Sequence, residues 1–377
     1  MGNDRAERKL SCLFIPTNYP SAGDPFGGII YVPHLNIACS VFQKVAALSN
    51  MYRTKGVEIR RLAGNAVLYE GASAARSLGK IDTPVMIMKS LLRGLRSIRA
   101  CGIDIIVAHG LRWAGFIGAL LSSFTRRPLL LFIHSTAPQD RKSRLLTFIT
   151  AYAIRHSRKV FFMSSGQALG YTKSFPVGDP VIIGNPVDAD TFTISPPEAD
   201  VREVRIVFAG RPTPDKGFPL LLDIIERLAA VRDDISFTLL TDLRLLSKVD
   251  ADRLAQIARI DLRHYQEKAE FARILNSSSF LLCLSRFESF SYVIAEAMAC
   301  GKPVVATECD GPRDLLNENN GVLVPIDNAE EAYRAVLWMI EHHRKYDPRS
   351  IREDIVSRFS YNAVRARLEQ SLAGMNP

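Results

Sequence analysis

The chain has 377 residues, which is too long for one ordinary hydrophobic core, so we expect two domains. Hydrophobic residues make up 47% of it and charged residues 23%, which is typical of folded globular proteins and excludes a disordered chain. The net charge of +9 favours an anionic partner: the phosphates of a nucleotide, an anionic membrane face or a nucleic acid. Nucleic acid is the weakest of these, because the sequence has no recognised binding motif and no stretch of interleaved aromatic and basic residues.

The cysteines and the amino terminus indicate the cytoplasm. The six cysteines include no C-x-x-C pair and several lie in apolar stretches, so we interpret them as reduced thiols. No apolar run reaches the roughly 18 residues of a membrane span. The first ten residues lack the apolar centre of a signal peptide, and Ala6 stands where a myristoylation pattern needs Ser or Thr.

The first expected strand, residues 10–16, leads into a loop over residues 17–30 that contains Gly27 and Gly28. Consecutive glycines after a first strand let the backbone approach a phosphate or a sugar closely, although a plain turn explains them equally well. We expect a helix over residues 33–50 after this loop. A later strand, residues 159–165, should end in a helix that is capped by Ser165.

Met86–Cys101 forms a basic amphipathic pattern. On a helical wheel one side carries apolar residues that include Met88 and Leu95, and the other side carries Lys89, Arg93 and Arg96 with no acid. Such a helix can lie on anionic lipid. Alternatively, it is a domain helix with its apolar side in the core and a solvated basic side.

Two histidines follow apolar runs that predict buried parallel strands. His109 ends the run over residues 104–110, and His134 follows the run over residues 129–133. Open α/β sheets bind ligands beside the carboxyl ends of their strands. Either histidine is therefore a candidate ligand-binding residue, and the alternative is a structural hydrogen-bonding role.

The second half begins a new βαβ series at residue 204. Arg211 and Lys216 lie five positions apart in a strand-to-helix loop, where both charges can converge on a diphosphate beside the helix amino terminus. A surface basic pair is the alternative. The sequence shows no clustered Asp/His ligand set, which predicts that no metal takes part.

Two of the acids in residues 285–316 lie eight positions apart: Glu288 in a polar loop, and Glu296 in a small-residue helix that stops at Gly301. The helix start attracts anions and an acid in the helix can accept hydrogen bonds from sugar hydroxyls, which together suit a nucleotide. An ordinary αβ crossover with solvated acids is the alternative.

These acids, with seven residues between them and AMACGKPVVA after them, resemble the E-x7-E signature of the retaining glycosyltransferases of family 4. The stretches GRPTPDKG, FIHST and residues 181–192 also resemble motifs of that family. The resemblance implies the GT-B fold, an α/β architecture of two Rossmann-like domains whose parallel sheets face a central cleft. We expect an acceptor-binding domain over residues 1–188, a nucleotide-sugar-binding domain over residues 189–354, and a final helix over about 355–377 that packs back on the first domain.

The resemblance also implies roles for individual residues. His134 is catalytic beside the donor sugar, Arg211 and Lys216 bind the donor diphosphate, Glu288 contacts the donor sugar, and Glu296 binds the ribose. The other implied donor-binding residues are Gly27, Gly28, Ser289, Phe290 and Ser291. Three positions depart from the family: Pro186 and Ser291 replace glycines, and Thr241–Arg244 replaces a glycine-rich turn.

The function implied is transfer of a hexosyl group, with retention of configuration, from a nucleotide-diphosphate sugar to a glycan or lipid-linked acceptor in cell-envelope polysaccharide or glycolipid synthesis. UDP is favoured over GDP, and no cofactor or metal is expected. The protein would be cytoplasmic, at the inner membrane face if Met86–Cys101 binds lipid. The alternatives are a retaining phosphorylase of the same fold and a non-catalytic protein that binds sugar nucleotide or anionic lipid.

Overall fold

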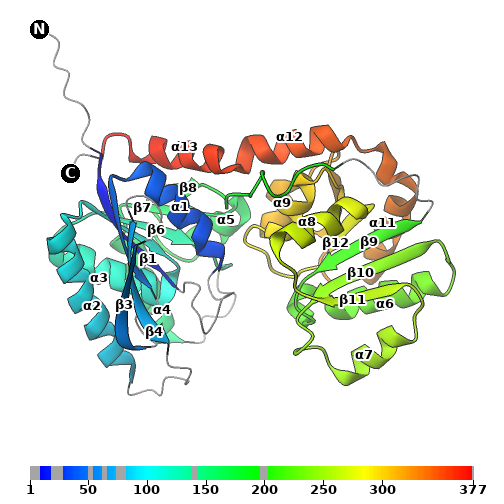
Figure 1. Ribbon diagram of the computed structural model, residues 1–377, viewed down its shortest axis with the longest axis horizontal. Coiled ribbons are helices and arrows are strands. Elements are labelled where there is room, and N and C mark those ends of the chain that lie inside the picture. Colours follow the sequence, from blue (N-terminus) through cyan, green and yellow to red (C-terminus); the bar gives the residue numbers. More distant parts are fainter. Residues whose placement is uncertain are drawn as a thin grey trace, which may run out of the picture. The chain divides into compact units, whose positions relative to one another are not determined.

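The computed structural model describes residues 9–17, 29–49, 54–61, 66–73, 82–136, 143–195 and 203–375. The chain divides into two compact units (Figure 1). The first comprises Met1–Met163, Ala168–Ile183 and Arg365–Pro377, and the second comprises Ser164–Gln167 and Gly184–Val364. Each unit has a predominantly parallel sheet between helices, so the predicted class of two Rossmann-like folds is confirmed.

The sheet of the first unit has the order β3-β4-β2-β1-β5-β6-β7-β8, and all neighbours pair in parallel except β3 and β4, which are antiparallel. The strands are β1 (Ser11–Pro16), β2 (Lys44–Ser49), β3 (Thr54–Arg61), β4 (Ala66–Ser73), β5 (Ile105–His109), β6 (Leu129–Ile133), β7 (Lys159–Phe162) and β8 (Pro180–Ile182). The helices are η1 (Ile29–Tyr31), α1 (Val32–Val41), α2 (Asp82–Cys101), η3 (Leu111–Gly115), α3 (Phe116–Thr125) and α4 (Arg144–Arg155), and α5 (Ser165–Thr172) and α13 (Tyr361–Leu372) have residues in both units.

The two faces of β1 separate the core of the first unit from its candidate functional residues. Leu13 and Ile15 belong to a hydrophobic core that this sheet shares with α2, α3 and α4. Phe14 points to the opposite face because strand residues alternate, and there it contacts His109, which in turn contacts His34 of α1.

Two local sequence predictions in the first half of the chain were wrong. The helix expected over residues 33–50 ends at Val41, and Lys44–Ser49 form β2 instead. The apolar run KVAALS fits a helix and a strand equally well by periodicity, and pairing with β1 and β4 on its two sides decides for the strand. The cap of α5 is Ser164, whose hydroxyl accepts a hydrogen bond from the Gln167 N–H at 3.3 Å.

The basic pattern at Met86–Cys101 lies within α2, and part of the predicted wheel is confirmed. Leu95 and Ile98 pack against the core, and Gly94 lies so close to Leu121 of α3 that a Cβ would be 2.6 Å from its side chain. Met88, assigned to the apolar side, is instead 57% exposed. Among the described residues, no helix combines the length and apolarity needed to cross a membrane.

The second unit has the all-parallel order β11-β10-β9-β12-β13-β14. The strands are β9 (Val204–Ala209), β10 (Ile235–Thr241), β11 (Ile260–His264), β12 (Phe280–Cys283), β13 (Val304–Thr307) and β14 (Gly321–Val324). The helices are η4 (Pro214–Lys216), α6 (Phe218–Ala229), α7 (Lys248–Ala255), α8 (Lys268–Ser277), α9 (Tyr292–Ala299), α10 (Asp310–Leu315), α11 (Ala329–His342), η5 (His343–Lys345) and α12 (Pro348–Phe359).

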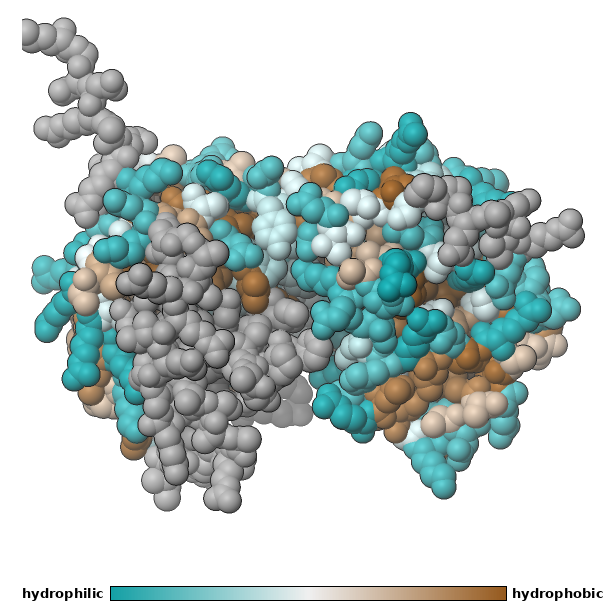
Figure 2. All heavy atoms as spheres, viewed as in Figure 1, coloured by the Kyte–Doolittle hydropathy of each residue, from teal (hydrophilic) through white to brown (hydrophobic). Residues whose placement is uncertain are grey.

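Helices α6 and α11 share the main core of the second unit with its strands, while α9 contacts both α8 and α12. Figure 2 shows hydrophobic side chains at the surface between β11 and α7, at the open edge of this sheet. Leu245 and Val249 are among the exposed hydrophobic residues of this part of the chain. The polar residues of interest lie at the carboxyl ends of β9 and β12, which are neighbours in the middle of the sheet.

Candidate functional site

The loop between β9 and α6 is pressed against the end of β12. Gly217 ends it with φ +70°, a left-handed conformation that favours glycine. A Cβ at this position would lie 2.0 Å from the carbonyl oxygen of Leu284, so only glycine fits. The N–H of Arg286 donates to the carbonyl oxygen of Asp215 at 2.9 Å and closes the contact. This approach places Lys216 beside the loop that carries Glu288.

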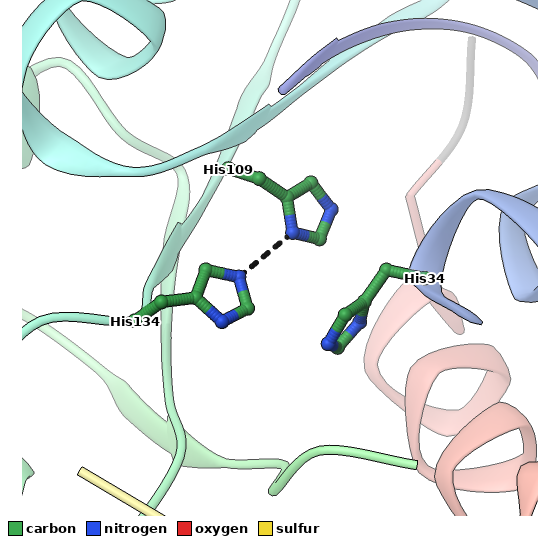
Figure 3. A group of neighbouring side chains, drawn as sticks. All are labelled: His34, His109 and His134. Atoms are coloured by element: carbon green, nitrogen blue, oxygen red, sulfur yellow. Dashed lines mark hydrogen bonds between the residues drawn. The ribbon is translucent and has the colours of Figure 1, made fainter. Parts of the chain in front are cut away.

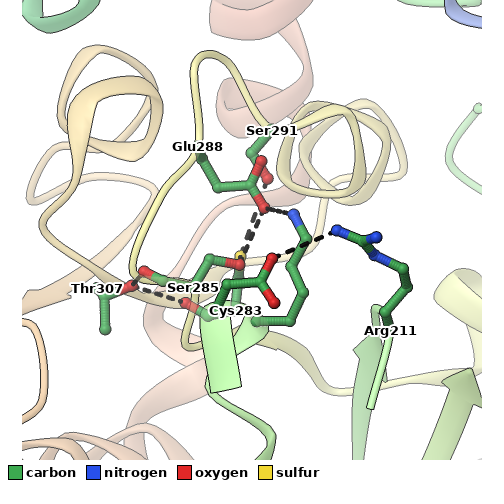
Figure 4. A network of polar contacts seen from close by, with 8 residues as sticks. Arg211, Cys283, Ser285, Glu288, Ser291 and Thr307 are labelled. Atoms are coloured by element: carbon green, nitrogen blue, oxygen red, sulfur yellow. Dashed lines mark hydrogen bonds and ion pairs between the residues drawn. The ribbon is translucent and has the colours of Figure 1, made fainter. Parts of the chain in front are cut away.

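Lys216 and Glu288 form an ion pair with 2.6 Å between Nζ and Oε1 (Figure 4). The Ser285 hydroxyl donates to the same carboxylate oxygen at 2.9 Å. Burial pulls the pKa of Lys216 down, but the neighbouring Glu288 more than offsets it, so the pKa is raised and the ammonium stays charged. Two residues that the sequence separates by 72 positions are therefore brought together.

Arg211 pairs with Asp215 at 3.3 Å, and both side chains are about half exposed. Exposed ion pairs contribute at most about 1 kcal/mol, so the guanidinium can leave Asp215 for an anionic ligand at little cost. Arg211 and Lys216 also both act electrostatically on Tyr265, just after β11, which places the two cations in one region.

The loop from Glu288 to Ser291 is held by its backbone and by Phe290. The Gly311 N–H donates to the Glu288 carbonyl oxygen at 2.7 Å, and buried Phe290 packs edge-on against Phe359 at 5.0 Å between ring centroids. Ser291, the residue before α9, has φ +79°, which explains physically why the resembling family has glycine there.

A buried thiol links this loop to β12. Cys283 Sγ lies 3.8 Å from the hydroxyl oxygens of both Ser285 and Ser291, and Thr307 donates to the Ser285 carbonyl oxygen (Figure 4). Burial raises the pKa of Cys283 to about 11, so the thiol is neutral at physiological pH. Cys283 therefore serves as packing for the loop and not as a nucleophile.

Glu296 lies in different surroundings from Glu288. It is half-buried in α9, and burial raises its pKa to about 8, an effect that Lys268 opposes and Asp188 reinforces. Lys268 and Asp188 form an ion pair at 3.3 Å. Much of Glu296 is therefore protonated at neutral pH, and a protonated carboxyl both donates and accepts hydrogen bonds.

His134 lies in the first unit, in the segment after β6. Ser135 Oγ lies 3.2 Å from the Tyr171 hydroxyl, which donates to the Thr136 carbonyl oxygen at 3.2 Å and so fixes this segment. His134 Nε2 lies 3.0 Å from Nδ1 of His109. Gly27 and Gly28 lie outside the described residues.

Several residues of these networks had no assigned role in the sequence interpretation. Ser285 ends an apolar run and could have been noticed as a strand-end hydroxyl, but Asp188 and Lys268 carry no local signal because only the fold brings them to Glu296. His34 has no sequence spacing that connects it to the other histidines.

The described site can be compared with known proteins. A family model described as "Glycosyl transferases group 1" matches residues 203–342, which include Arg211, Lys216, Glu288 and Glu296. An uncharacterized glycosyltransferase of Methanocaldococcus jannaschii is 28% identical over 255 residues, 66% of this chain and 69% of that protein. A phosphatidyl-myo-inositol mannosyltransferase of Mycolicibacterium smegmatis is 31% identical over 174 residues, 43% of each chain.

Solved structures share the fold over almost the whole chain. HepE of Anabaena, solved in complex with UDP, superimposes with a TM-score of 0.74 at 18% identity, covering 97% of this chain and 100% of the other.

Proposed function

The chain belongs to the group 1 glycosyltransferases and has their GT-B fold, and from this premise we propose that it transfers a hexosyl group from a nucleotide-diphosphate sugar with retention of configuration. The observation that carries the proposal is the linked pair Lys216–Glu288 with Arg211 nearby, at the carboxyl ends of β9 and β12. It joins two cations suited to a diphosphate with an acid suited to sugar hydroxyls.

Lys216 and Arg211 hold the donor diphosphate in this proposal. An ammonium has three N–H donors, so Lys216 can keep Glu288 and still donate to phosphate oxygens. Arg211 exchanges its exposed partner Asp215 for phosphate. Both cations neutralise the charge that grows on the nucleoside diphosphate as it leaves, which is the role that a metal ion plays in other transferases. We therefore propose that the reaction needs no metal.

The remaining roles follow from the two acids and His134. Glu288, oriented by Lys216 and Ser285, accepts hydrogen bonds from hydroxyls of the transferred sugar. Glu296 binds the ribose hydroxyls, and its raised pKa lets it donate as well as accept. His134 hydrogen-bonds the sugar and steadies the positive charge that develops at the anomeric carbon. We extend the donor-binding set to Ser289, Phe290, Ser291 and the two glycines Gly27 and Gly28.

We assign donor binding to residues 189–354 and acceptor binding to residues 1–188, with the final helix returning to the first domain. The donor base we favour is uracil, supported by the UDP complex of the structurally similar HepE, with guanine second. The acceptor is a glycan or a lipid-linked molecule, supported by the relative that is named for phosphatidyl-myo-inositol.

An exposed stripe of α2 supports the lipid-linked acceptor. Val85, Met88 and Leu92 are 53%, 57% and 49% exposed, and Lys89, Arg96 and Arg99 are exposed beside them. Their spacing of three and four residues places them on one side of the helix. Apolar side chains with adjacent cations suit the surface of an anionic bilayer. We propose that this stripe holds the protein at the cytoplasmic membrane face during transfer.

A vesicle co-sedimentation experiment tests the stripe. The protein should bind phosphatidylglycerol vesicles and not phosphatidylcholine vesicles, and Met88→Asp/Leu92→Asp should reduce binding at least tenfold. Val231→Asp, which changes an exposed apolar residue of the second unit, is the matched control. Equal binding by the wild type and the double variant would remove α2 from the interaction.

Calorimetric titration with UDP and GDP, followed by donor turnover, tests the transferase itself. One nucleotide should bind, and Lys216→Ala should lower kcat/KM on the order of 10²-fold, the scale of losing one charge-stabilising donor. Lys345→Ala, an exposed lysine of η5, should leave both unchanged. Turnover that requires inorganic phosphate would instead indicate a phosphorylase, and nucleotide binding without turnover across many acceptors would indicate a binding protein.

A further inference from the structure

Three histidines from separate elements meet inside the first unit. His34 lies in the first turn of α1, His109 is the last residue of β5, and His134 follows β6. One ring nitrogen of each lies within 4.8 Å of those of the other two, and Figure 3 shows the His34 ring pointing toward the other rings. From this geometry we propose that the three side chains form a binding site for a divalent transition metal ion, with Zn²⁺ as the reference ion.

The distances between the histidine nitrogens fit a tetrahedral metal site after a small adjustment. Tetrahedral Zn²⁺ binds imidazole nitrogens at about 2.0–2.1 Å, which places two such nitrogens about 3.3–3.4 Å apart. His109 Nδ1 and His134 Nε2, at 3.0 Å, are close to this separation. The nitrogen of His34, which lies within 4.8 Å of the other two, must approach by no more than about 1.5 Å to reach this separation. Three neutral imidazoles leave the fourth position open for water.

Aromatic side chains hold two of the three rings in place. His109 lies between Phe132, stacked at 4.3 Å between ring centroids, and Phe14 at 4.6 Å, and the Tyr31 ring lies edge-on to His134 at 5.2 Å. These aromatic contacts restrict the orientations that His109 and His134 can adopt.

Metal binding would oppose the transferase reaction, a consequence that rests on the proposed function. The ion would occupy Nε2 of His134 and place positive charge where the proposed transition state also becomes positive. Zn²⁺ should therefore inhibit turnover at the concentrations at which it binds. The binding itself is measured without donor or acceptor, so a failure of the metal site and a failure of the proposed function give different results.

The test uses the full chain without a histidine tag. Titration with Co²⁺ should produce the visible absorption of a four-coordinate ion, one equivalent of Zn²⁺ should displace it, and calorimetry should give one Zn²⁺ per chain. His34→Gln should weaken Zn²⁺ binding by at least about 10- to 100-fold, since even outer partners of metal ligands contribute that much. His109→Gln should do the same.

The controls separate this site from the other histidines. His342→Gln/His343→Gln removes the two adjacent histidines at the end of α11 and should leave binding unchanged. Amide hydrogen exchange of β5 and β6 shows whether the His109 variant is folded, because His109 is buried. If the His109 variant is unfolded, zinc binding by the His34 variant alone tests the site. A wild type that shows only six-coordinate Co²⁺, or Zn²⁺ binding that persists in His34→Gln and disappears in the control, would overturn the proposal.

Discussion

The ion pair between Lys216 and Glu288 should appear as a measurable coupling energy. The side chains are only 24% and 14% exposed. Two unit charges about 4 Å apart attract by about 4 kcal/mol at an effective dielectric constant near 20, and the loss of hydration of both groups cancels part of this. With 2.6 Å between the atoms and Ser285 as a further partner, we expect a net coupling of about 1–3 kcal/mol.

A double-mutant cycle measures this energy. Lys216→Met keeps the aliphatic stem and removes the charge, and Glu288→Gln keeps the shape of the carboxylate. Each single variant should lower the unfolding free energy by about 2–3 kcal/mol, because each leaves a half-buried charge without its partner. The double variant should lose less than the sum of the two single losses, and the difference is the coupling energy.

Urea unfolding supplies the free energies, and amide hydrogen exchange of peptides over residues 280–291 assigns the transition to the second unit. Lys345→Met, at an exposed position, is the control for the loss of a lysine charge. Additivity of the two single variants within about 0.5 kcal/mol would refute the reasoning, because independent sites behave in that way.

Three further predictions concern the same unit. Ser291→Gly should raise the unfolding free energy by about 0.5–1 kcal/mol in a urea titration, because relief of the left-handed φ outweighs the freedom that glycine adds to the unfolded chain; an unchanged value would mean that the conformation is not strained. Gly217→Ala should lower the unfolding free energy by at least about 2 kcal/mol, because the added Cβ would collide with the Leu284 carbonyl oxygen. A variant as stable as the wild type would contradict this contact. The pKa of Glu296, raised from 4.5 to about 8, means that its stabilisation is complete below about pH 4.5 and disappears as the pH rises to about 8; thermal melts should show a smaller loss over this window in Glu296→Gln, and identical profiles would place Glu296 in water.

The sequence predicted the second unit better than the first. Arg211, Lys216 and Glu288 fall in strand-to-helix loops whose glycine and proline positions restrict the backbone, so the sequence predicted both the loops and their charges. It could not predict that Lys216 would pair with Glu288, because that contact depends on how closely Gly217 approaches β12. Nor could it predict the raised pKa of Glu296, which results from burial in α9.

In the first unit the failures have a different cause. The run KVAALS carries no periodicity that separates a helix from a strand, and only its neighbours in the sheet decide. Met88 was placed on the apolar side of an ideal wheel, but close packing of Gly94 on α3 sets which side of α2 faces the core. His34 and His109 become neighbours only when α1 covers the end of β5.

The two acids show how one side-chain type can take two roles within a single signature. Glu288 is ion-paired with the Lys216 ammonium and accepts a hydrogen bond from the Ser285 hydroxyl. A carboxylate held in this way is suited to accept hydrogen bonds from sugar hydroxyls and to stabilise positive charge nearby. Burial instead raises the pKa of Glu296 to about 8, so near neutral pH it exchanges a proton easily. When two carboxyl groups of one site have different surroundings, one can stabilise charge while the other donates and accepts hydrogen bonds. Lys216 determines the surroundings of Glu288, and burial of the side chain determines those of Glu296. The spacing of the two acids in the sequence predicts neither effect.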